Sequence, residues 1–185
     1  MDNIARKEAL NLLNEYVKSE SLRKHCISVA YAMEKYAEKF RENKDKYWIC
    51  GLLHDFDYEK YSSLEQHPFE GVKILKEKGY DKEIINAILG HGNHTGVKRE
   101  SLMAKCLFAV DELCGLIIAL ARVRTGNFDG MDANSVRKAL KKKDFAKGIN
   151  REDIEQGIIE LGVNKEEHFN FVIRALNAAK KELGF

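Results

Sequence analysis

An all-α fold is predicted for this chain, and two observations carry the prediction. Apolar side chains recur with a period near 3.6 residues in nearly every segment, which is the period of an α-helix. Only one proline occurs in 185 residues, so few positions force a helix to end. The hydrophobic content of 44% and the charged content of 32% are those of a globular protein. We therefore expect a single helical domain over residues 1–185.

Three helices are expected in the N-terminal part of the chain. An amphipathic helix is predicted over residues 4–17, and a second helix begins near Ser21. A third runs roughly over 45–53 and ends just before a His-Asp pair. Gly51 lowers the helix propensity of this third segment, but its missing side chain would let a neighbouring helix approach closely.

The central segments alternate helices with polar loops. After a loop over 57–66, Pro68 is predicted at the first position of the next helix, where its missing N–H does no harm, and Gly79 ends that helix. Asp81 is the predicted N-cap of the helix that follows. The stretch 90–96 is the only loop dense in glycine and histidine, a composition that more often serves a site than a fold.

The C-terminal part begins with a long, largely buried helix over 104–121, followed by a linker over 125–132. Three further helical segments are expected at residues 135–143, 150–161 and 165–183. They hold no cluster of metal-binding side chains, so we interpret residues from about 130 to 185 as a helical extension packed on the same core. His168 stands among charged neighbours and is expected on the solvated surface.

Asp111 is out of place by ordinary packing rules. At helical spacing it shares one face with Leu107 and Cys114 in the long apolar helix. A carboxylate on such a face costs several kcal/mol unless it is paired or coordinates a cation. The other metal-ligand residue types that precede it in order are His25 and the adjacent pair His54 and Asp55. The sequence therefore predicts a divalent metal held by this ordered set.

The pattern of a histidine, a His-Asp pair and a later aspartate, spread over successive helices, resembles the HD-domain superfamily of metal-dependent phosphohydrolases. The similarity runs from about Leu22 to about Arg124. It is carried by the stretches 22–26, 51–56, 67–71, 87–96 and 107–113. Phe56 and Asp57 follow the pair, where many relatives carry Ile-Gly.

This resemblance implies an HD-domain-like helical bundle whose metal-binding core covers about residues 20–125. The ligands that it implies for a first divalent ion are His25, His54, Asp55 and Asp111. Asp55 would bridge to a second ion that is also held by His67 and His91, with His94 as the alternative to His91. One or two ions are expected, and mixed histidine and carboxylate ligation favours iron or manganese.

Each ligand candidate also has a purely structural interpretation. His25 taken singly is typical of a hydrogen-bonded core histidine, and the His-Asp pair is typical of a helix C-terminus. Asp111 would then pair with a buried arginine such as Arg122 or Arg124, and His67 would cap the helix that follows it. All these interpretations would have to hold together, in this order, so we prefer the metal interpretation.

The implied activity is hydrolysis of a phosphate ester or anhydride by an activated water, with His54 and Asp55 as catalytic residues. The expected substrate is a small phosphorylated metabolite, in particular a nucleotide: a dinucleoside polyphosphate or a nucleoside phosphate. The basic residues that are candidates to meet its phosphate are Arg23, Lys98 and Arg99. Two other functions stay open, namely a metal- or nucleotide-binding sensor without turnover and a two-iron oxygenase of the same fold.

Composition also narrows the expected partners and location. The basic run over 137–147 lacks interleaved aromatic residues beyond Phe145, so we interpret it as a solvated helix face and expect no nucleic acid. No run of about 18 uncharged apolar residues exists, so no membrane span is expected. The N-terminus lacks the apolar core of a signal peptide, which predicts a cytoplasmic protein. A homodimer is left open.

Overall fold

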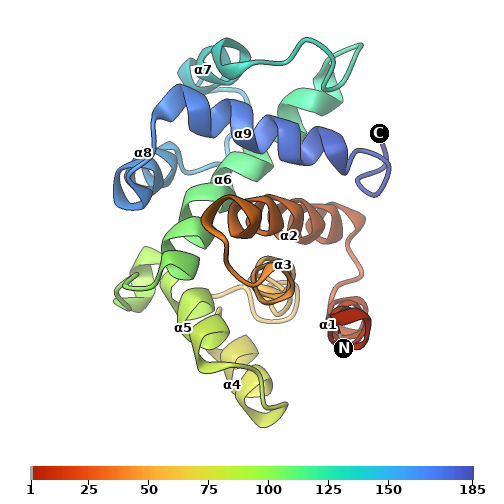
Figure 1. Ribbon diagram of the computed structural model, residues 1–185, viewed down its shortest axis with the longest axis vertical. Coiled ribbons are helices and arrows are strands. Elements are labelled where there is room, and N and C mark those ends of the chain that lie inside the picture. The colour runs from red at the N-terminus through yellow and green to blue at the C-terminus, as the bar shows by residue number, and fades with distance from the viewer. Residues whose placement is uncertain (1) are drawn as a thin grey trace.

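The structure, a computed structural model, describes residues 2–185, with side chains described from residue 5 onward. Within this part every regular element is a helix, which confirms the predicted all-α fold. The elements are α1 (Asp2–Tyr16), α2 (Glu20–Phe40), α3 (Lys44–Leu53), α4 (Phe69–Glu77), α5 (Lys82–Gly90), the short 3₁₀ helix η1 (Asn93–Thr95), α6 (Leu102–Val123), α7 (Ala133–Lys141), α8 (Arg151–Leu161) and α9 (Lys165–Ala178). In Figure 1, α6 runs through the centre of the molecule, with α1 to α5 toward one end and α7 to α9 toward the other.

Polar side chains fix where several of these helices begin. Ser19, Asn43 and Ser101 accept hydrogen bonds from backbone N–H groups in the first turns of α2, α3 and α6. Asp81 caps α5 in the same way, as the sequence predicts. The prediction for Pro68 was wrong by one residue: its backbone, at φ −91° and ψ 13°, lies outside the helical region, so α4 begins at the next residue.

Helices α2 and α3 are in very close contact at Gly51. A Cβ atom at this position would lie 2.8 Å from the Cα of Ala30, so no larger residue fits without a shift of the backbone. The predicted close approach at Gly51 is thereby confirmed. Because the helices meet here, the residues that follow the end of α3 lie beside the N-terminal half of α2.

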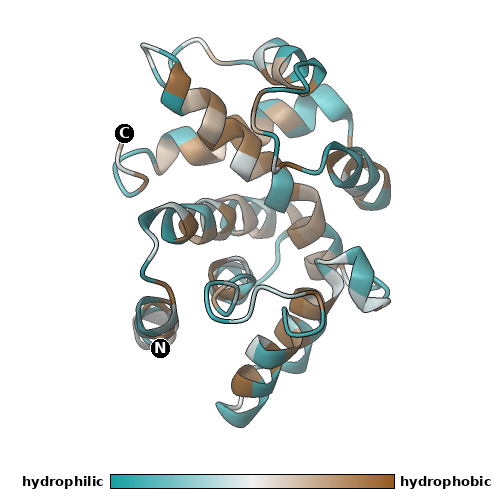
Figure 2. Ribbon diagram, turned by 180° about the vertical axis from the view of Figure 1, so that it is seen from behind, coloured by the Kyte–Doolittle hydropathy of each residue, from teal (hydrophilic) through white to brown (hydrophobic). Residues whose placement is uncertain are grey.

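The C-terminal helices pack against α6 and α2. Gly157 on α8 allows a second close crossing, since a Cβ there would lie 2.6 Å from the Cα of Ala109 on α6. Helix α9 contacts both α2 and α6, and one buried apolar cluster contains residues from each of α1 to α9. In Figure 2 the hydrophobic residues, in brown, lie mostly on the sides of helices that face one another. The C-terminal segment therefore shares the core of the N-terminal part.

The prediction that His168 lies on the solvated surface was wrong. His168 is 1% exposed and faces inward from α9. The hydroxyl of Tyr36 lies 2.5 Å from its Nδ1, and its Nε2 lies 3.0 Å from the carbonyl oxygen of Ala109. Burial lowers the pKa of His168 to about 4, so the ring is neutral, with Nε2–H as the donor to the carbonyl. Its partners come from distant segments, which the charged neighbours in sequence could not indicate.

No helix in the described part of the chain combines the length and the apolar composition needed to cross a bilayer. The most apolar long helix is α6, and charged side chains such as Lys105 and Glu112 interrupt it.

Candidate metal centre

Five separate segments bring histidines and aspartates to one place in the fold. Helix α2 carries His25, and α6 carries Asp111. His54 is the C-cap of α3, with Asp55 directly after it. Two further histidines arrive from the turn before α4 and from the C-cap of α5. Their side chains form two clusters that share Asp55.

The first cluster joins His25, His54, Asp55 and Asp111. The Nε2 atom of His25 lies 3.2 Å from the Nε2 of His54 and 3.0 Å from the Oδ1 of Asp111. The same Asp111 oxygen lies 3.3 Å from the Nε2 of His54. Asp55 Oδ2 lies 3.4 Å from His54 Nε2 and 3.8 Å from His25 Nε2. Each imidazole Nε2 therefore faces a carboxylate oxygen from two different segments.

The second cluster joins Asp55, His67 and His91. The Nε2 atoms of His67 and His91 lie 3.1 Å apart. The other oxygen of Asp55, Oδ1, lies 3.2 Å from His67 Nε2 and 3.3 Å from His91 Nε2. Asp55 thus presents one carboxylate oxygen to each cluster, which is the arrangement of a bridging carboxylate.

Hydrogen bonds at the opposite ring nitrogens fix the tautomers of three of these histidines. The Nδ1 of His54 lies 2.8 Å from the Gly51 carbonyl oxygen, and the Nδ1 of His91 lies 2.6 Å from the Ile88 carbonyl oxygen. A carbonyl oxygen only accepts, so each Nδ1 carries a proton, and whenever the ring is neutral its lone pair is at Nε2. Burial lowers the pKa of His54, but the carboxylates of Asp55 and Asp111 raise it well above its ordinary value, so His54 Nε2 also carries a proton when no cation is bound. The Nδ1 of His67 likewise donates to a carboxylate.

These tautomers explain why the donor set fits a divalent cation. In the neutral rings, lone pairs at the Nε2 atoms of His67 and His91 point at one another and at a carboxylate oxygen, which is repulsive without positive charge between them. Burial lowers the pKa of His67, but its hydrogen bonds to Asp55 and Asp57 raise that pKa to about 9, so a proton supplies the positive charge when no cation is bound. Imidazole nitrogen and carboxylate oxygen are the ligands that zinc, iron and manganese take in proteins. A cation at each cluster would convert this repulsion into coordination.

Charge coupling within the first cluster is strong. Burial alone would raise the pKa of Asp111, but the nearby His54 and the hydrogen bonds from both histidines hold the pKa of this carboxyl below its usual value. Burial likewise opposes ionisation of Asp55, and the same histidine with its hydrogen-bonding neighbours holds its pKa well below the ordinary range. Both carboxylates are therefore ionised and available to a cation. Glu112 differs, because burial, and then the charge of Asp111, raises its pKa to about 8.

Asp57 is a member of the site that the sequence analysis did not single out as functional. It is 1% exposed, and its Oδ1 accepts a hydrogen bond of 2.8 Å from the Nδ1 of His67. Its Oδ2 accepts from the backbone N–H of Gly71 at 2.8 Å, and a Cβ on that glycine would lie 2.7 Å from the carboxylate. Such a carboxylate orients a metal-binding histidine and makes its Nε2 more basic. In the sequence, the feature that could have drawn attention to Asp57 is that Phe56 and Asp57 stand where many relatives carry Ile-Gly.

His94, the alternative to His91 as a ligand, lies in η1 with its ring packed over Gly92. Its Nε2 donates to the carbonyl oxygen of His67 at 2.9 Å. The His91 imidazole is therefore part of the second cluster, whereas the His94 ring lies against the backbone of His67.

The clusters open into a cavity of about 490 Å³. Its lining consists of His25, Asp55, Tyr58, His67, His91, Gly92, Asn93, His94, Phe108, Asp111, Glu112, Gly115, Ile149, Asn150 and Asp153. The sequence analysis assigned no role to Tyr58, Glu112, Asn150 or Asp153. The last two belong to the C-terminal extension, whose sequence carries no ligand pattern to mark them.

The three basic residues expected to meet a phosphate do not line this cavity. Arg23 donates from Nη2 to the carbonyl oxygen of Val17 at 3.0 Å. Arg99 donates to both oxygens of Glu160, at 2.6 and 2.8 Å, so its guanidinium is already engaged. Lys98 is exposed and borders other depressions of the surface.

The arginines considered as partners of Asp111 also lie elsewhere. Arg124 donates to the carbonyl oxygens of Asn127 and Asp129 in the loop after α6, and Arg122 is exposed. The ion-pair partners of Asp111 in the described structure are His25 and His54.

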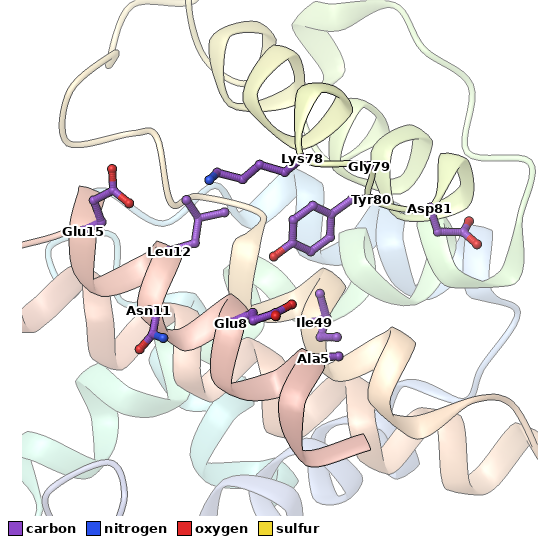
Figure 3. Close-up of a pocket in the computed structure, with 10 residues that line it drawn as sticks. All are labelled: Ala5, Glu8, Asn11, Leu12, Glu15, Ile49, Lys78, Gly79, Tyr80 and Asp81. Atoms are coloured by element: carbon purple, nitrogen blue, oxygen red, sulfur yellow. The ribbon is translucent and has the colours of Figure 1, made fainter. Parts of the chain in front are cut away.

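A second depression, of about 580 Å³, lies between α1, α3 and the turn that joins α4 to α5. Figure 3 shows Tyr80 extending from that turn toward α1, with Glu8 near it. Its lining contains no histidine, and none of its residues belongs to the two clusters. We therefore place the candidate site at the smaller cavity, which is lined by the histidines and aspartates of the two clusters.

Comparison with known proteins agrees with this geometry. The family model of the HD domain matches residues 22–116, which contain every residue of the two clusters. The chain belongs to the HD domain family, the metal-dependent phosphohydrolase superfamily that the ordered histidines and aspartates resemble. No curated protein and no solved structure matches the chain. The cavity wall formed by residues 149–153 lies outside the family match.

Proposed function

We propose that this protein is a metal-dependent phosphohydrolase acting on a small phosphorylated metabolite, with nucleotides as the expected kind of substrate. The observation that carries the proposal is the shared carboxylate of Asp55, which offers one oxygen to each of two histidine clusters at the floor of an open cavity. In two-metal hydrolases a bridging carboxylate holds the ions close enough to act on one phosphoryl group.

The residues of the chain divide into two holding groups. His25, His54 and Asp111, together with one oxygen of Asp55, would hold the first ion. His67 and His91, with the other oxygen of Asp55, would hold the second. When bound, divalent cations lower the pKa of a water molecule toward about 7 and withdraw charge from a phosphoryl oxygen.

The chain itself supplies orientation and access. His54 is fully buried and is held by the Gly51 carbonyl, so its Nε2 keeps one direction. The Asp55 side chain is 17% exposed and reaches the cavity, so it can contact the two metal ions and also the substrate. In the overall reaction the water oxygen ends on phosphorus, the ester bond breaks, and the leaving oxygen takes a proton.

The test is a screen for released phosphate and released nucleotides with the full chain. Metal-free protein should release neither, and addition of Fe²⁺, Mn²⁺ or Co²⁺ should give release from at least one member of a panel of nucleoside monophosphates, dinucleoside polyphosphates and sugar phosphates. Asp111→Ala should lower that rate by at least about a hundredfold, because it removes charge from the first cluster.

Glu152→Gln is the matched control, because Glu152 is exposed and does not line the cavity. It should keep the rate of the unmodified chain. An absence of metal-stimulated release from every substrate, in a protein that retains its metal, would overturn the proposal in favour of a sensor or an oxygenase.

A further inference from the structure

The cavity wall opposite the metal clusters comes from the loop after α7 and from the first turn of α8. Ile149, Asn150 and Asp153 contribute to it. It stands close to the clusters: the position of a Cβ on Gly115 lies 2.8 Å from Ile149 Cδ1 and 3.9 Å from His25 Nδ1. A substrate whose phosphate lies at the clusters would therefore have this wall within reach of its remaining part.

Arg151 holds the loop that forms the wall. Its guanidinium donates to four backbone carbonyl oxygens, at distances from 2.6 to 3.1 Å. The carbonyls belong to Leu140, Lys142, Phe145 and Ile149. The charge of Arg151 is thus directed into the loop and away from the cavity.

Asp153 is fixed in the wall by two neutral amides. Asn93 Nδ2 donates to its Oδ1 at 2.9 Å, and Asn150 Nδ2 donates to its Oδ2 at 2.8 Å. Amides orient a carboxylate without neutralising it. Burial raises the pKa of Asp153 and the charge of Arg99 lowers it, and in the described structure no lysine or arginine donates to its oxygens, so its carboxylate is not ion-paired at the cavity wall.

No lysine or arginine is among the residues that line this cavity in the described structure. The guanidinium of Arg99 is the one directed toward Asn93 on the rim, but it is paired with Glu160 through both carboxylate oxygens and lies 3.6 Å above the Phe108 ring. Outside the clusters, the carboxyl groups of the lining are those of Asp153 and of Glu112, whose pKa is raised to about 8.

This distribution of charge limits the substrate. Two divalent cations, with the carboxylates of Asp55, Asp57 and Asp111, would leave roughly one positive charge, which one phosphate dianion more than balances. A further phosphate or carboxylate on the substrate would meet Asp153 with no cation to pair with it. Hydroxyl and amino groups, in contrast, would donate hydrogen bonds to the oxygens of the wall.

We propose that the cavity takes a phosphate monoester whose remaining part bears hydroxyl or amino groups and no further negative charge, and that Asp153 selects it. This inference rests on the proposed function and narrows it. Among the nucleotides, it favours a nucleoside monophosphate and disfavours a dinucleoside polyphosphate. Hydrolysis then breaks one P–O ester bond, adds water, and yields orthophosphate and an alcohol.

Binding can be measured apart from turnover with two phosphonates of the same length. 3-Hydroxypropylphosphonate and 3-phosphonopropionate differ only in a terminal hydroxymethyl against a carboxylate. In calorimetry on the Mn²⁺-loaded chain, the hydroxyl compound should bind about tenfold more tightly, as one repelled charge near the wall implies. Asp153→Asn should reduce this ratio to about threefold or less, because the carboxylate compound then binds more tightly. Asp129→Asn, at an exposed loop position, should leave the ratio unchanged.

Turnover gives the second readout. Glycerol 3-phosphate should have a kcat/KM about tenfold above that of 3-phosphoglycerate, and Asp153→Asn should narrow the gap. Equal or tighter binding of 3-phosphonopropionate by the unmodified chain would overturn the inference even if Asp153→Asn did not fold. Hydrolysis without the binding preference would leave the phosphohydrolase proposal standing and remove this one. The binding preference without any hydrolysis would support the charge selection at the cavity wall and overturn the phosphohydrolase proposal.

Discussion

Asp57 decides how His67 faces the second cluster. Its buried carboxylate holds the Nδ1 proton of His67 and is itself held by the N–H of Gly71. The sequence singled out His67 as a ligand candidate, but the orienting carboxylate depends on how the turn after α3 folds back toward α4. Asp111, by contrast, could be recognised from the sequence because a carboxylate interrupts an apolar helical stripe.

Asp57→Asn is expected to weaken Mn²⁺ binding at the second cluster by about 10- to 100-fold, because an amide cannot make the His67 ring as basic as a carboxylate does. The affinity of the first cluster should stay within about threefold. Calorimetric titration of metal-free protein with Mn²⁺ resolves the two steps. Asp129→Asn, at an exposed loop position, is the control. Unchanged affinity at both steps in Asp57→Asn would show that the hydrogen bond to His67 has no role in metal binding.

His168 should make the stability of the fold depend on pH. Its folded pKa of about 4 lies below the unfolded value of about 6.5, so the unfolded chain binds the extra proton between these values. The stabilisation from neutral His168 is fully present above about pH 6.5 and is lost as the pH falls toward about 4.

The comparison is between the unmodified chain and His168→Gln in urea unfolding with a metal chelator present. The difference in unfolding free energy should shrink by about 1.4 kcal/mol for each pH unit below about 6.5. A difference that stays constant with pH would mean that His168 has an ordinary pKa in the fold. The sequence could not reveal this residue as buried, because its partners Tyr36 and Ala109 lie far away along the chain.

At the level of the helices, periodicity and capping residues were sufficient to predict most elements. Asp81 was predicted as the N-cap of α5 and has that role in the structure. The predicted third helix begins at residue 45, one residue after the start of α3. The last segment was predicted to reach 183, yet α9 ends at Ala178, because the apolar pattern continues through the turns that follow. Which helices cross, and where, is set by side-chain shape at contacts between distant segments. Gly51 indicated one such crossing, and Gly157 was not singled out.

Gly51→Ala and Gly157→Ala should each destabilise the fold by about 1 to 3 kcal/mol, because the added methyl group meets helix backbone at 2.8 and 2.6 Å. Gly148→Ala is the matched change, since a Cβ there meets nothing within 4 Å, and it should alter stability by less than about 0.5 kcal/mol. Urea unfolding at neutral pH measures all three. Equal effects at the three positions would mean that the two crossings tolerate a wider separation.

For the whole molecule, the family core and the C-terminal extension contribute different parts of one cavity. Residues within 22–116 carry both ligand clusters, and α8 with the loop before it closes the opposite side. The clusters could be predicted from the order of ligand residue types along the chain. The wall could not be predicted, because in the sequence Asn150 and Asp153 are ordinary residues of a helix start. They line the cavity only because α8 packs on α6.

Metal content tests the central claim most directly. Metal-free protein reconstituted with Mn²⁺ or Fe²⁺, desalted and analysed for bound metal should hold two ions per chain and should unfold at a higher temperature than the metal-free form. Asp55→Ala should lose both ions, because Asp55 is the shared ligand, whereas Asp129→Ala should keep both. His91→Ala should lose one. One ion or none in the unmodified chain, or two ions retained by Asp55→Ala, would contradict a centre built on a bridging Asp55.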